Sequence, residues 1–244
     1  MKAGKVRKKV LALLLAGTAI LGLTGGGTMQ VEAAGQENAY VDTSSYEQLY
    51  KLYEDYFKLG IACQAMDHWN DPTAEIGNQE KEELINRMFN SMTFGNELKP
   101  AYNFDASSEN LFKVDFAAEE MLEWAKENNM KVRGHVLVWH SQVDPSIFAI
   151  DYQAYADGKL TKSDTAKLDE ECLVDREELL ARLKRYIYGV LEYTYKNGYA
   201  DVIYAWDVVN EAADENQYDG LRRSYWYQII GPVSYTHLTL PTKA

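Results

Sequence analysis

The sequence predicts an α/β fold in which helices cover a parallel sheet. Amphipathic helical segments alternate with short apolar runs along the chain, and these runs are nearly continuously apolar, as in strands buried on both faces. The length of 244 residues suits one domain of ordinary size or one large barrel. The alternation fits a closed barrel and an open sheet equally well.

Each of the first two predicted strands is preceded by a predicted helix. Residues 45–59 place Leu49, Leu52, Tyr53 and Tyr56 on one face, end at Gly60 and lead into the apolar run 61–66. A second helix starts near Gln79 and precedes the run 92–94; its apolar positions are Leu84, Ile85, Met88 and Phe89.

Two further helices precede the longest apolar runs. Residues 115–129 direct Ala118, Met121, Leu122 and Ala125 inward and precede the run 132–140. A polar surface loop is expected over 151–172. Asp175 and Glu178 then form a capping box for a helix that ends at Asn197-Gly198, before the run 202–210. The buried stripe of this helix is Leu179, Leu183, Ile187, Val190 and Leu191.

Residues 1–33 predict a secretory signal peptide. A basic start is followed by an apolar stretch of 14 residues, 10–23, and by small residues around Ala33. Fourteen residues fall short of the roughly 20 needed to cross a bilayer. We therefore expect cleavage and secretion to the extracellular space, with no membrane association afterwards; a retained anchor is the alternative.

Charge and cysteine content exclude several classes of protein. The formal charge of −12 becomes −16 when residues 1–33 leave with five bases and one acid, which disfavours nucleic acid and anionic membranes as partners. Cys63 and Cys172 are too few for a disulfide framework or a cysteine metal site, and their spacing permits a bridge without requiring one. No glycine-rich phosphate loop follows any strand, so no nucleotide cofactor is expected.

Polar residues follow three of the predicted strands, at the carboxyl ends where parallel α/β folds place functional groups. They are Asn96-Glu97, residues 135–142, and Asn210-Glu211. A carboxylate buried beside an amide at Glu211 suits a general acid; the alternative is a carboxylate that caps a turn.

His135 and His140 are five residues apart, so strand alternation points them to opposite faces and disfavours a shared metal ion; no metal site is expected. Each could equally be a core histidine. His135 shares a face with Trp139, and together with Gln142 these side chains suit a sugar, which stacks on aromatic rings and hydrogen-bonds to imidazole and amide groups.

Three motifs in order resemble glycoside hydrolase family 10, the endo-1,4-β-xylanases. They are GNELKP at 95–100, RGHVLVWHSQ at 133–142 and WDVVNEA at 206–212, and the resemblance covers roughly residues 46–231. It implies a TIM (β/α)8 barrel, of which the chain covers about the first four βα units. It also implies retaining hydrolysis of xylan or xylo-oligosaccharides without a metal or cofactor.

The resemblance also assigns roles. Glu211 falls on the general acid/base and Asn210 on the residue that binds the sugar 2-hydroxyl. The remaining substrate-binding positions are Asn96, Lys99, His135 and Trp139, with His140 and Gln142 in support. Strict alternation would turn Asn210 and Glu211 to opposite sides, so we expect an irregular strand end or a bulge there.

Two departures from the family follow. The commonest pattern has Glu where this chain has Gly95, so a substrate hydrogen bond is missing or is supplied by Glu97. The retaining mechanism also needs a second carboxylate about 5–5.5 Å from the first. In the family this nucleophile ends the seventh strand; no such segment occurs in this sequence, and the family gives Glu97 no such role.

We therefore expect residues 34–231 to be the N-terminal half of a barrel domain and 232–244 to be a tail of vector or adaptor origin, with a native C-terminus as the alternative. The chain lacks the nucleophile and a four-strand piece exposes two sheet edges, so the chain is expected to be inactive and poorly folded alone. Alternative functions are a non-catalytic carbohydrate-binding protein that uses His135 and Trp139, and a cellulase-type barrel hydrolase.

Overall fold

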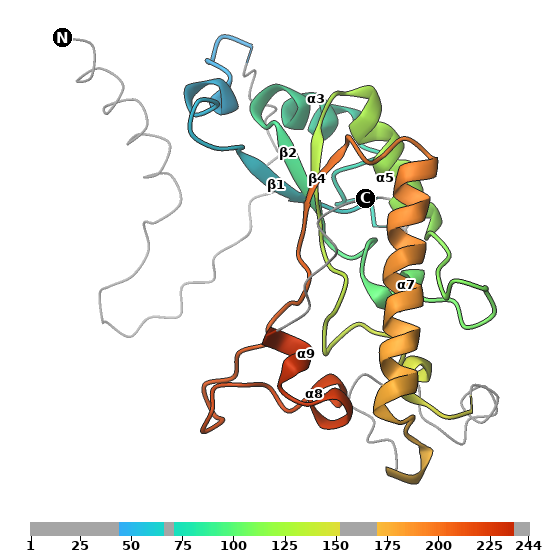
Figure 1. Ribbon diagram of the computed structural model, residues 1–244. Coiled ribbons are helices and arrows are strands. Elements are labelled where there is room, and N and C mark those ends of the chain that lie inside the picture. The colour runs from blue at the N-terminus through green and yellow to red at the C-terminus, as the bar shows by residue number, and fades with distance from the viewer. Residues whose placement is uncertain (1–43, 66–70, 152–169, 237–244) are drawn as a thin grey trace, which may run out of the picture. The chain divides into compact units, whose positions relative to one another are not determined.

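The computed structural model describes residues 44–65, 71–151 and 170–236 (Figure 1). The predicted signal peptide, most of the expected loop 151–172 and residues 237–244 of the tail lie outside these ranges. All of the described residues belong to one compact unit, and the description below concerns that unit alone.

Four parallel strands form one sheet, in the order β1-β2-β3-β4. They are β1 (Gly60–Cys63), β2 (Ser91–Phe94), β3 (Lys131–Gly134) and β4 (Ile203–Trp206). Each strand after β1 pairs with its predecessor in the chain, without the reversal of order found in doubly wound open sheets. The α/β prediction is confirmed, and the strand order is that of successive strands in a barrel.

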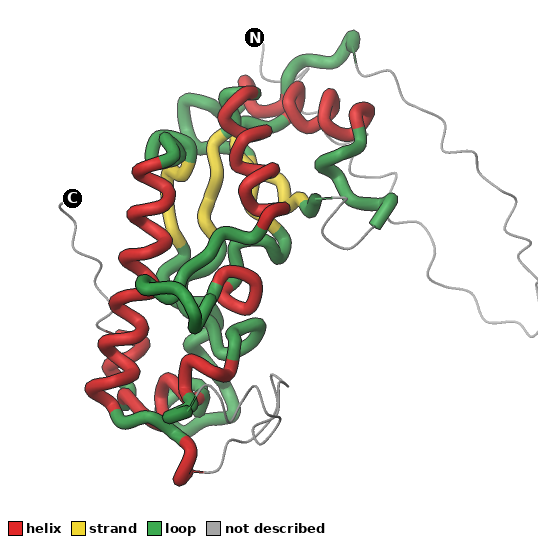
Figure 2. The backbone as a smooth tube through the Cα atoms, turned by 90° about the vertical axis from the view of Figure 1, so that its right-hand side faces the viewer, coloured by secondary structure: helices red, strands yellow, loops and turns green. Residues whose placement is uncertain are grey.

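Helices connect the strands, as the alternation predicts. The principal ones are α3 (Gln79–Met88), α5 (Phe116–Glu127) and α7 (Arg176–Lys196). Figure 2, turned to the side where α5 and α7 lie in Figure 1, shows helices alongside the strands. The shorter elements are η1 (Leu49–Leu52), α4 (Pro100–Asn103), η2 (Pro145–Phe148), η3 (Glu170–Cys172), α8 (Tyr225–Ile230) and α9 (Val233–Thr236).

Helix caps lie where the sequence places them. The Asp175 side chain accepts a hydrogen bond from the backbone N–H of Glu178 at 2.9 Å, and α7 ends at Asn197 before Gly198, whose φ is +73°. The buried stripe of α7 includes Leu179 and Leu183. The fourth predicted helix is therefore confirmed at both ends.

The buried side chains form two clusters. One lies between α5 and the sheet, where Met121 and Leu122 pack with Met92 and Val132. The other joins α7 and α8 to the segment after β3 and includes Leu137, Phe148, Leu179, Tyr186 and Trp226. Because α7 contributes to the second cluster and packs against α8 and η2, it supports the chain that follows β3.

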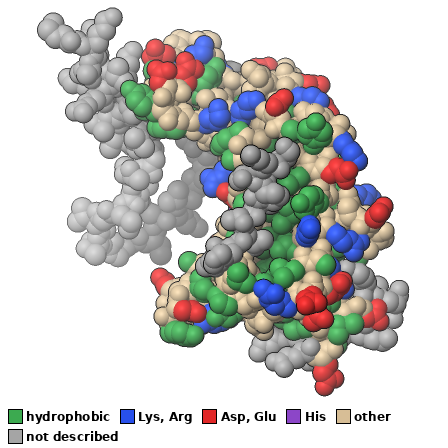
Figure 3. All heavy atoms as spheres, in the orientation of Figure 1, with side chains coloured by type: hydrophobic (Ala, Val, Ile, Leu, Met, Phe, Trp, Pro, Cys, Tyr) green, Lys and Arg blue, Asp and Glu red, His purple; other side chains and the backbone are tan. Residues whose placement is uncertain are grey.

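The edges of the described sheet belong to β1 and β4, each of which pairs on one side only. Tyr204 of β4 is 46% exposed. On the face shown in Figure 3, hydrophobic side chains reach the surface among charged ones. No helix in the described part of the chain is long and apolar enough to span a membrane.

The helix predicted over residues 45–59 is wrong. Only the single 3-10 turn η1 forms there, and the intended inner face is exposed, with Tyr56 at 82% and Leu49 at 37%. A helix of this length is stabilised mainly by packing of its apolar face. Here that face remains in contact with solvent, and Tyr53 stacks on Phe57 instead.

Two strands are also shorter than their apolar runs. β3 ends at Gly134 and β4 at Trp206, while single contacts such as the isolated bridge between Val138 and Val209 continue the pairing. A register shift between Val132 and Arg133 interrupts the regular pattern. The predicted alternation of side chains over 132–140 therefore fails beyond β3.

Candidate active site

The carboxyl ends of β2, β3 and β4 bring most of the predicted site residues together. Hydrogen bonds, ion pairs and ring contacts connect the members of this group, which we call the strand-end cluster. Its members are Asn96, Lys99, His135, Trp139, His140, Gln142 and Glu211. Asn210 is next to the cluster in the chain, and its backbone N–H donates to the Val138 carbonyl at 2.9 Å.

Glu211 lies between two rings. Trp139 Nε1 donates to Glu211 Oε2 at 3.1 Å, and His140 Nε2 lies 3.8 Å from the same oxygen. The Glu211 side chain is 50% exposed, so the expectation that it is buried is wrong. Its φ of +51° confirms the irregular backbone expected at Asn210-Glu211. A carboxylate that is held on one oxygen and open to solvent can exchange protons with a ligand and with water.

His140 is a partly buried imidazole beside Glu211. Burial lowers its pKa, and the nearby Arg222 lowers it further, whereas Glu211 and Asp214 act in the opposite direction. Its Nδ1 atom is buried and has no hydrogen-bond partner among the described residues. The distance of 3.8 Å to Glu211 is too long for a hydrogen bond, and the contact becomes an ion pair only when His140 is protonated.

Lys99 joins the chain after β2 to the chain after β3. Its Nζ donates to Asn96 Oδ1 at 2.9 Å and to Gln142 Oε1 at 2.5 Å, and it lies 5.0 Å from the centre of the Trp139 ring. Gln142 Nε2 donates to the same Asn96 oxygen at 3.0 Å. Lys99 is 7% exposed, and burial lowers its pKa, opposed by Glu97 and Glu211. The result is a rigid polar group beside an indole face.

His135 is oriented by a residue that sequence reasoning missed. Asp207 Oδ2 lies 2.9 Å from His135 Nδ1, and Asp207 Oδ1 accepts from Arg133 Nε at 2.8 Å. The carboxylate favours the tautomer with a proton on Nδ1, which leaves Nε2 of His135 to accept a hydrogen bond. The signal was an acidic residue within the apolar run 202–210. Contrary to the predicted opposite faces, Trp139 contacts both His135 and His140.

Glu97 has a structural role, because its side chain binds backbone N–H groups. It is fully buried, with Oε1 accepting from Ala65 N–H at 3.0 Å and Oε2 from Asn96 N–H at 2.9 Å. Both oxygens thus hold the chain after β1 against the chain after β2. The alternative in which Glu97 supplies the hydrogen bond missing at Gly95 is wrong, because its carboxylate does not reach solvent.

Two further possibilities can be assessed over the described residues. No group of three or more His, Cys, Asp or Glu side chains there could hold a metal ion. Cys63 and Cys172 are free thiols, which answers the pairing question left open by their spacing. Burial raises the pKa of the Cys63 thiol to about 12, so it does not act as a nucleophile.

Comparisons with known proteins point to one family. Residues 48–240 match the model of glycosyl hydrolase family 10. The chain is 40% identical over 184 residues to endo-1,4-β-xylanase A of Caldicellulosiruptor sp., covering 75% of this chain and 23% of that protein. With endo-1,4-β-xylanase A of Thermotoga maritima it shares 37% over 185 residues, covering 75% and 14%.

A solved structure gives the same result. A mutant of an intracellular xylanase from Thermoanaerobacterium saccharolyticum, in complex with xylotriose, matches with a TM-score of 0.59 and 31% identity, over 78% of this chain and 50% of that one. The chain therefore spans about half the length of this solved xylanase and a smaller share of the two curated relatives.

Proposed function

The chain belongs to glycosyl hydrolase family 10, a family of endo-1,4-β-xylanases with a TIM barrel, and from this we propose that its gene product is a secreted enzyme that hydrolyses xylan with retention of configuration. The observation that carries the proposal is the hydrogen bond from Trp139 to a half-exposed Glu211 beside a rigid group of polar side chains. The signal-like pattern of residues 1–33 supports export.

Glu211 is proposed as the general acid/base. In its protonated form it donates a proton to the glycosidic oxygen as the C–O bond breaks, and as a carboxylate it later removes a proton from water. Trp139 holds Oε2, which leaves Oε1 to carry the proton. The half-exposed position suits both steps, because the leaving oxygen and the incoming water must each reach the same carboxyl group.

The mechanism requires a second carboxylate about 5–5.5 Å from the first, as nucleophile. Glu97 does not suit this role because it is buried and bonded to two backbone N–H groups. Asp207 does not suit it because it binds Arg133 and His135. We therefore place the nucleophile outside the described residues.

The other members of the strand-end cluster are proposed to bind the sugar. Trp139 offers a ring for stacking, His135 an acceptor nitrogen, and Lys99 with Asn96 and Gln142 a fixed set of polar atoms for hydroxyl groups. Asn210 is proposed to bind the 2-hydroxyl, with His140 in support. The complexes of the Thermoanaerobacterium xylanase with xylotriose and xylotetraose support xylo-oligosaccharides as ligands here.

Substitution of Glu211 tests the proposal. In the gene product, Glu211→Gln should lower reducing-sugar release from xylan by roughly 10²–10⁴-fold, the usual contribution of a general acid/base, and leave xylotriose binding within about two-fold. Glu215→Gln, an exposed site four residues away, is the matched control. Unchanged turnover in Glu211→Gln would remove the assignment. Xylan binding without hydrolysis in the wild type would favour a carbohydrate-binding protein, and preference for carboxymethyl cellulose would favour a cellulase.

A further inference from the structure

Gln64 follows β1 directly and has an unused side chain. Its backbone is engaged, since its N–H donates to Glu75 Oε2 at 3.1 Å and its carbonyl accepts from Ile76 N–H at 3.0 Å. Its carboxamide, however, forms no hydrogen bond with any of the described residues, although Gln64 is partly buried. Partly buried amides in native proteins usually have partners, so this one is available to a ligand.

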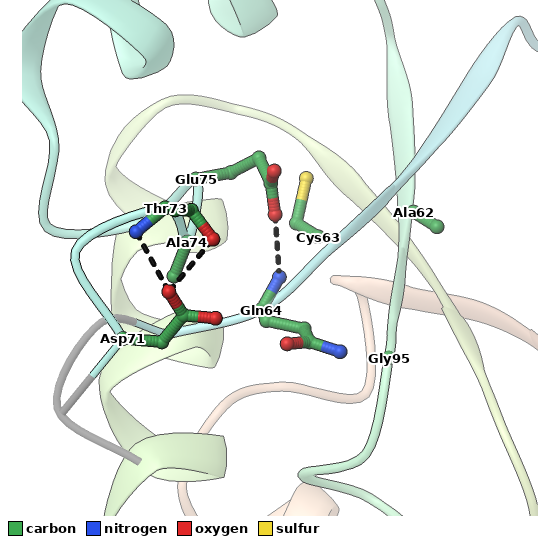
Figure 4. A pocket seen from close by; sticks show the side chains of 8 residues that line it. All are labelled: Ala62, Cys63, Gln64, Asp71, Thr73, Ala74, Glu75 and Gly95. Atoms are coloured by element: carbon green, nitrogen blue, oxygen red, sulfur yellow. Dashed lines mark hydrogen bonds between the residues drawn. The ribbon is translucent and has the colours of Figure 1, made fainter. Parts of the chain in front are cut away.

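The Gln64 carboxamide occupies the space that a side chain at residue 95 would fill. A Cβ atom added to Gly95 would lie 2.7 Å from Gln64 Cγ and 2.9 Å from its Nε2, closer than real Cβ contacts. Figure 4 shows the Gln64 side chain directed toward Gly95. Gly95 is adjacent to Asn96, whose Oδ1 belongs to the strand-end cluster. The carboxamide therefore lies at the β1 side of the proposed sugar-binding group.

The two residues line an open pocket of about 280 Å³. This volume is near the lower end of the roughly 300–1,000 Å³ of small-molecule sites. Each carboxylate of the pocket is bonded through one oxygen: Asp71 Oδ1 accepts from Thr73, and Glu75 Oε2 accepts from the Gln64 N–H (Figure 4). The Gln64 amide is a neutral group that both donates and accepts, which matches neighbouring hydroxyls of an uncharged sugar.

We propose that Gln64 is a substrate-binding residue that determines specificity, and that Gly95 is required to make room for it. Gln64 binds the sugar unit next to the one held by Trp139 and Asn96, in the position that a side chain at residue 95 would otherwise occupy. This inference rests on the proposed function, because its ligand is the same xylo-oligosaccharide.

The proposal makes the two positions interdependent. Any side chain at residue 95 must displace Gln64, so Gly95→Ala should weaken binding through Gln64 and not through a contact of its own. Once Gln64 is shortened, the methyl group has space. The effects of Gln64→Ala and Gly95→Ala should therefore be non-additive, as expected for residues in contact.

Calorimetric titration of the gene product with xylotetraose tests this, with Glu211→Gln present in every protein so that the ligand is not hydrolysed. The protein with Glu211→Gln alone is the wild type of this comparison. Gln64→Met, which keeps the length of the side chain and removes its hydrogen-bonding atoms, should raise the Kd about ten-fold, as loss of a pair of hydrogen bonds does. Gly95→Ala should have a similar effect, and Gln64→Ala/Gly95→Ala should bind no worse than Gln64→Ala. Gln79→Ala, which alters an exposed glutamine on α3, should bind like the wild type.

The outcomes separate this inference from the proposed function. If the wild type fails to bind xylotetraose, the proposed function is wrong and the role of Gln64 falls with it. If the wild type binds and Gln64→Met binds within two-fold of it, the role of Gln64 alone is overturned. Additive effects of the two alanine substitutions would overturn the role assigned to Gly95. Unchanged circular dichroism of Gln64→Met would show that lost binding is not lost folding.

Discussion

Arg182 is predicted to be essential for the stability of the segment that follows β3. It lies on α7, is 5% exposed, and donates through Nη1 to the carbonyls of Ile147 at 3.0 Å and Ala149 at 2.7 Å. A third carbonyl, that of Ser146, is 3.4 Å away, and Nε donates to Glu178 at 2.6 Å. Arg182 thus binds the backbone of η2, which continues the chain carrying Trp139, His140 and Gln142.

The cost of losing Arg182 can be worked out from these bonds. Arg182→Ala leaves two carbonyls without their short hydrogen bonds, at about 1–3 kcal/mol each when they remain buried. The ion pair with the half-exposed Glu178 adds only about 0.3–0.5 kcal/mol. Water admitted to the vacated space would offset part of the loss, so we expect about 3 kcal/mol in total.

Urea unfolding of the gene product, followed by tryptophan fluorescence, measures this loss. With a slope of about 2 kcal/mol per molar urea, the midpoint should fall by roughly 1.5 M. Arg182→Met keeps the packing of the aliphatic stem and should lose nearly as much. Arg185→Ala is the matched control, because Arg185 is exposed on the same helix and binds the Glu109 carbonyl; its midpoint should fall by less than about 0.5 M. Equal shifts for Arg182→Ala and Arg185→Ala would refute the reasoning.

Three further predictions concern single side chains. Burial lowers the pKa of His140 below its usual 6.5, so as the pH falls the unfolded chain binds a proton before the folded chain does. The stability of the folded chain should therefore fall as the pH drops from about 6.5 through the lowered pKa. His140→Gln should lose this dependence, and NMR titration should show the low pKa directly. Ellman's reagent should label Cys172 before the buried Cys63, with both thiols reactive in urea and no reductant. Gly134→Ala should cost about 1–3 kcal/mol in urea unfolding, because its Cβ would lie 2.3 Å from the Trp206 ring; a midpoint equal to that of the wild type would contradict this.

The sequence was sufficient for the order of the four strands and for both ends of α7. The capping side chains Asn78, Asp115 and Asp175 each accept a backbone hydrogen bond at the start of a helix. These interactions are local, so they can be predicted from residue spacing alone. The three motifs likewise predicted which side chains would meet in the strand-end cluster, because the carboxyl ends of neighbouring parallel strands share one edge.

What could not be predicted depends on distant contacts. The stretch 45–59 has helical spacing, but nothing local shows whether its apolar face will be covered, and Tyr56 remains 82% exposed. Asp207 is not predicted as a site residue, because its role depends on contacts with Arg133 and His135, more than 70 residues earlier in the chain. The free side chain of Gln64 became visible only when Gly95 was placed beside it.

The strand-end cluster exists because two strands stop being regular. Alternation along 132–140 would have separated His135 and Trp139 from His140, and alternation at 210–211 would have separated Asn210 from Glu211. Instead, β3 and β4 end early, and Gln142 and Glu211 both adopt positive φ, at +42° and +51°. Positive φ is unfavourable for residues other than glycine and persists only where the surroundings enforce it, often at functional sites. Here the backbone carbonyl of Gln142 accepts from the Ala101 N–H at 2.8 Å, and that of Glu211 accepts from Arg222 Nε at 2.8 Å. The side chains of the same two residues bond to Lys99 and Trp139, so the irregular strand ends carry contacts of the site.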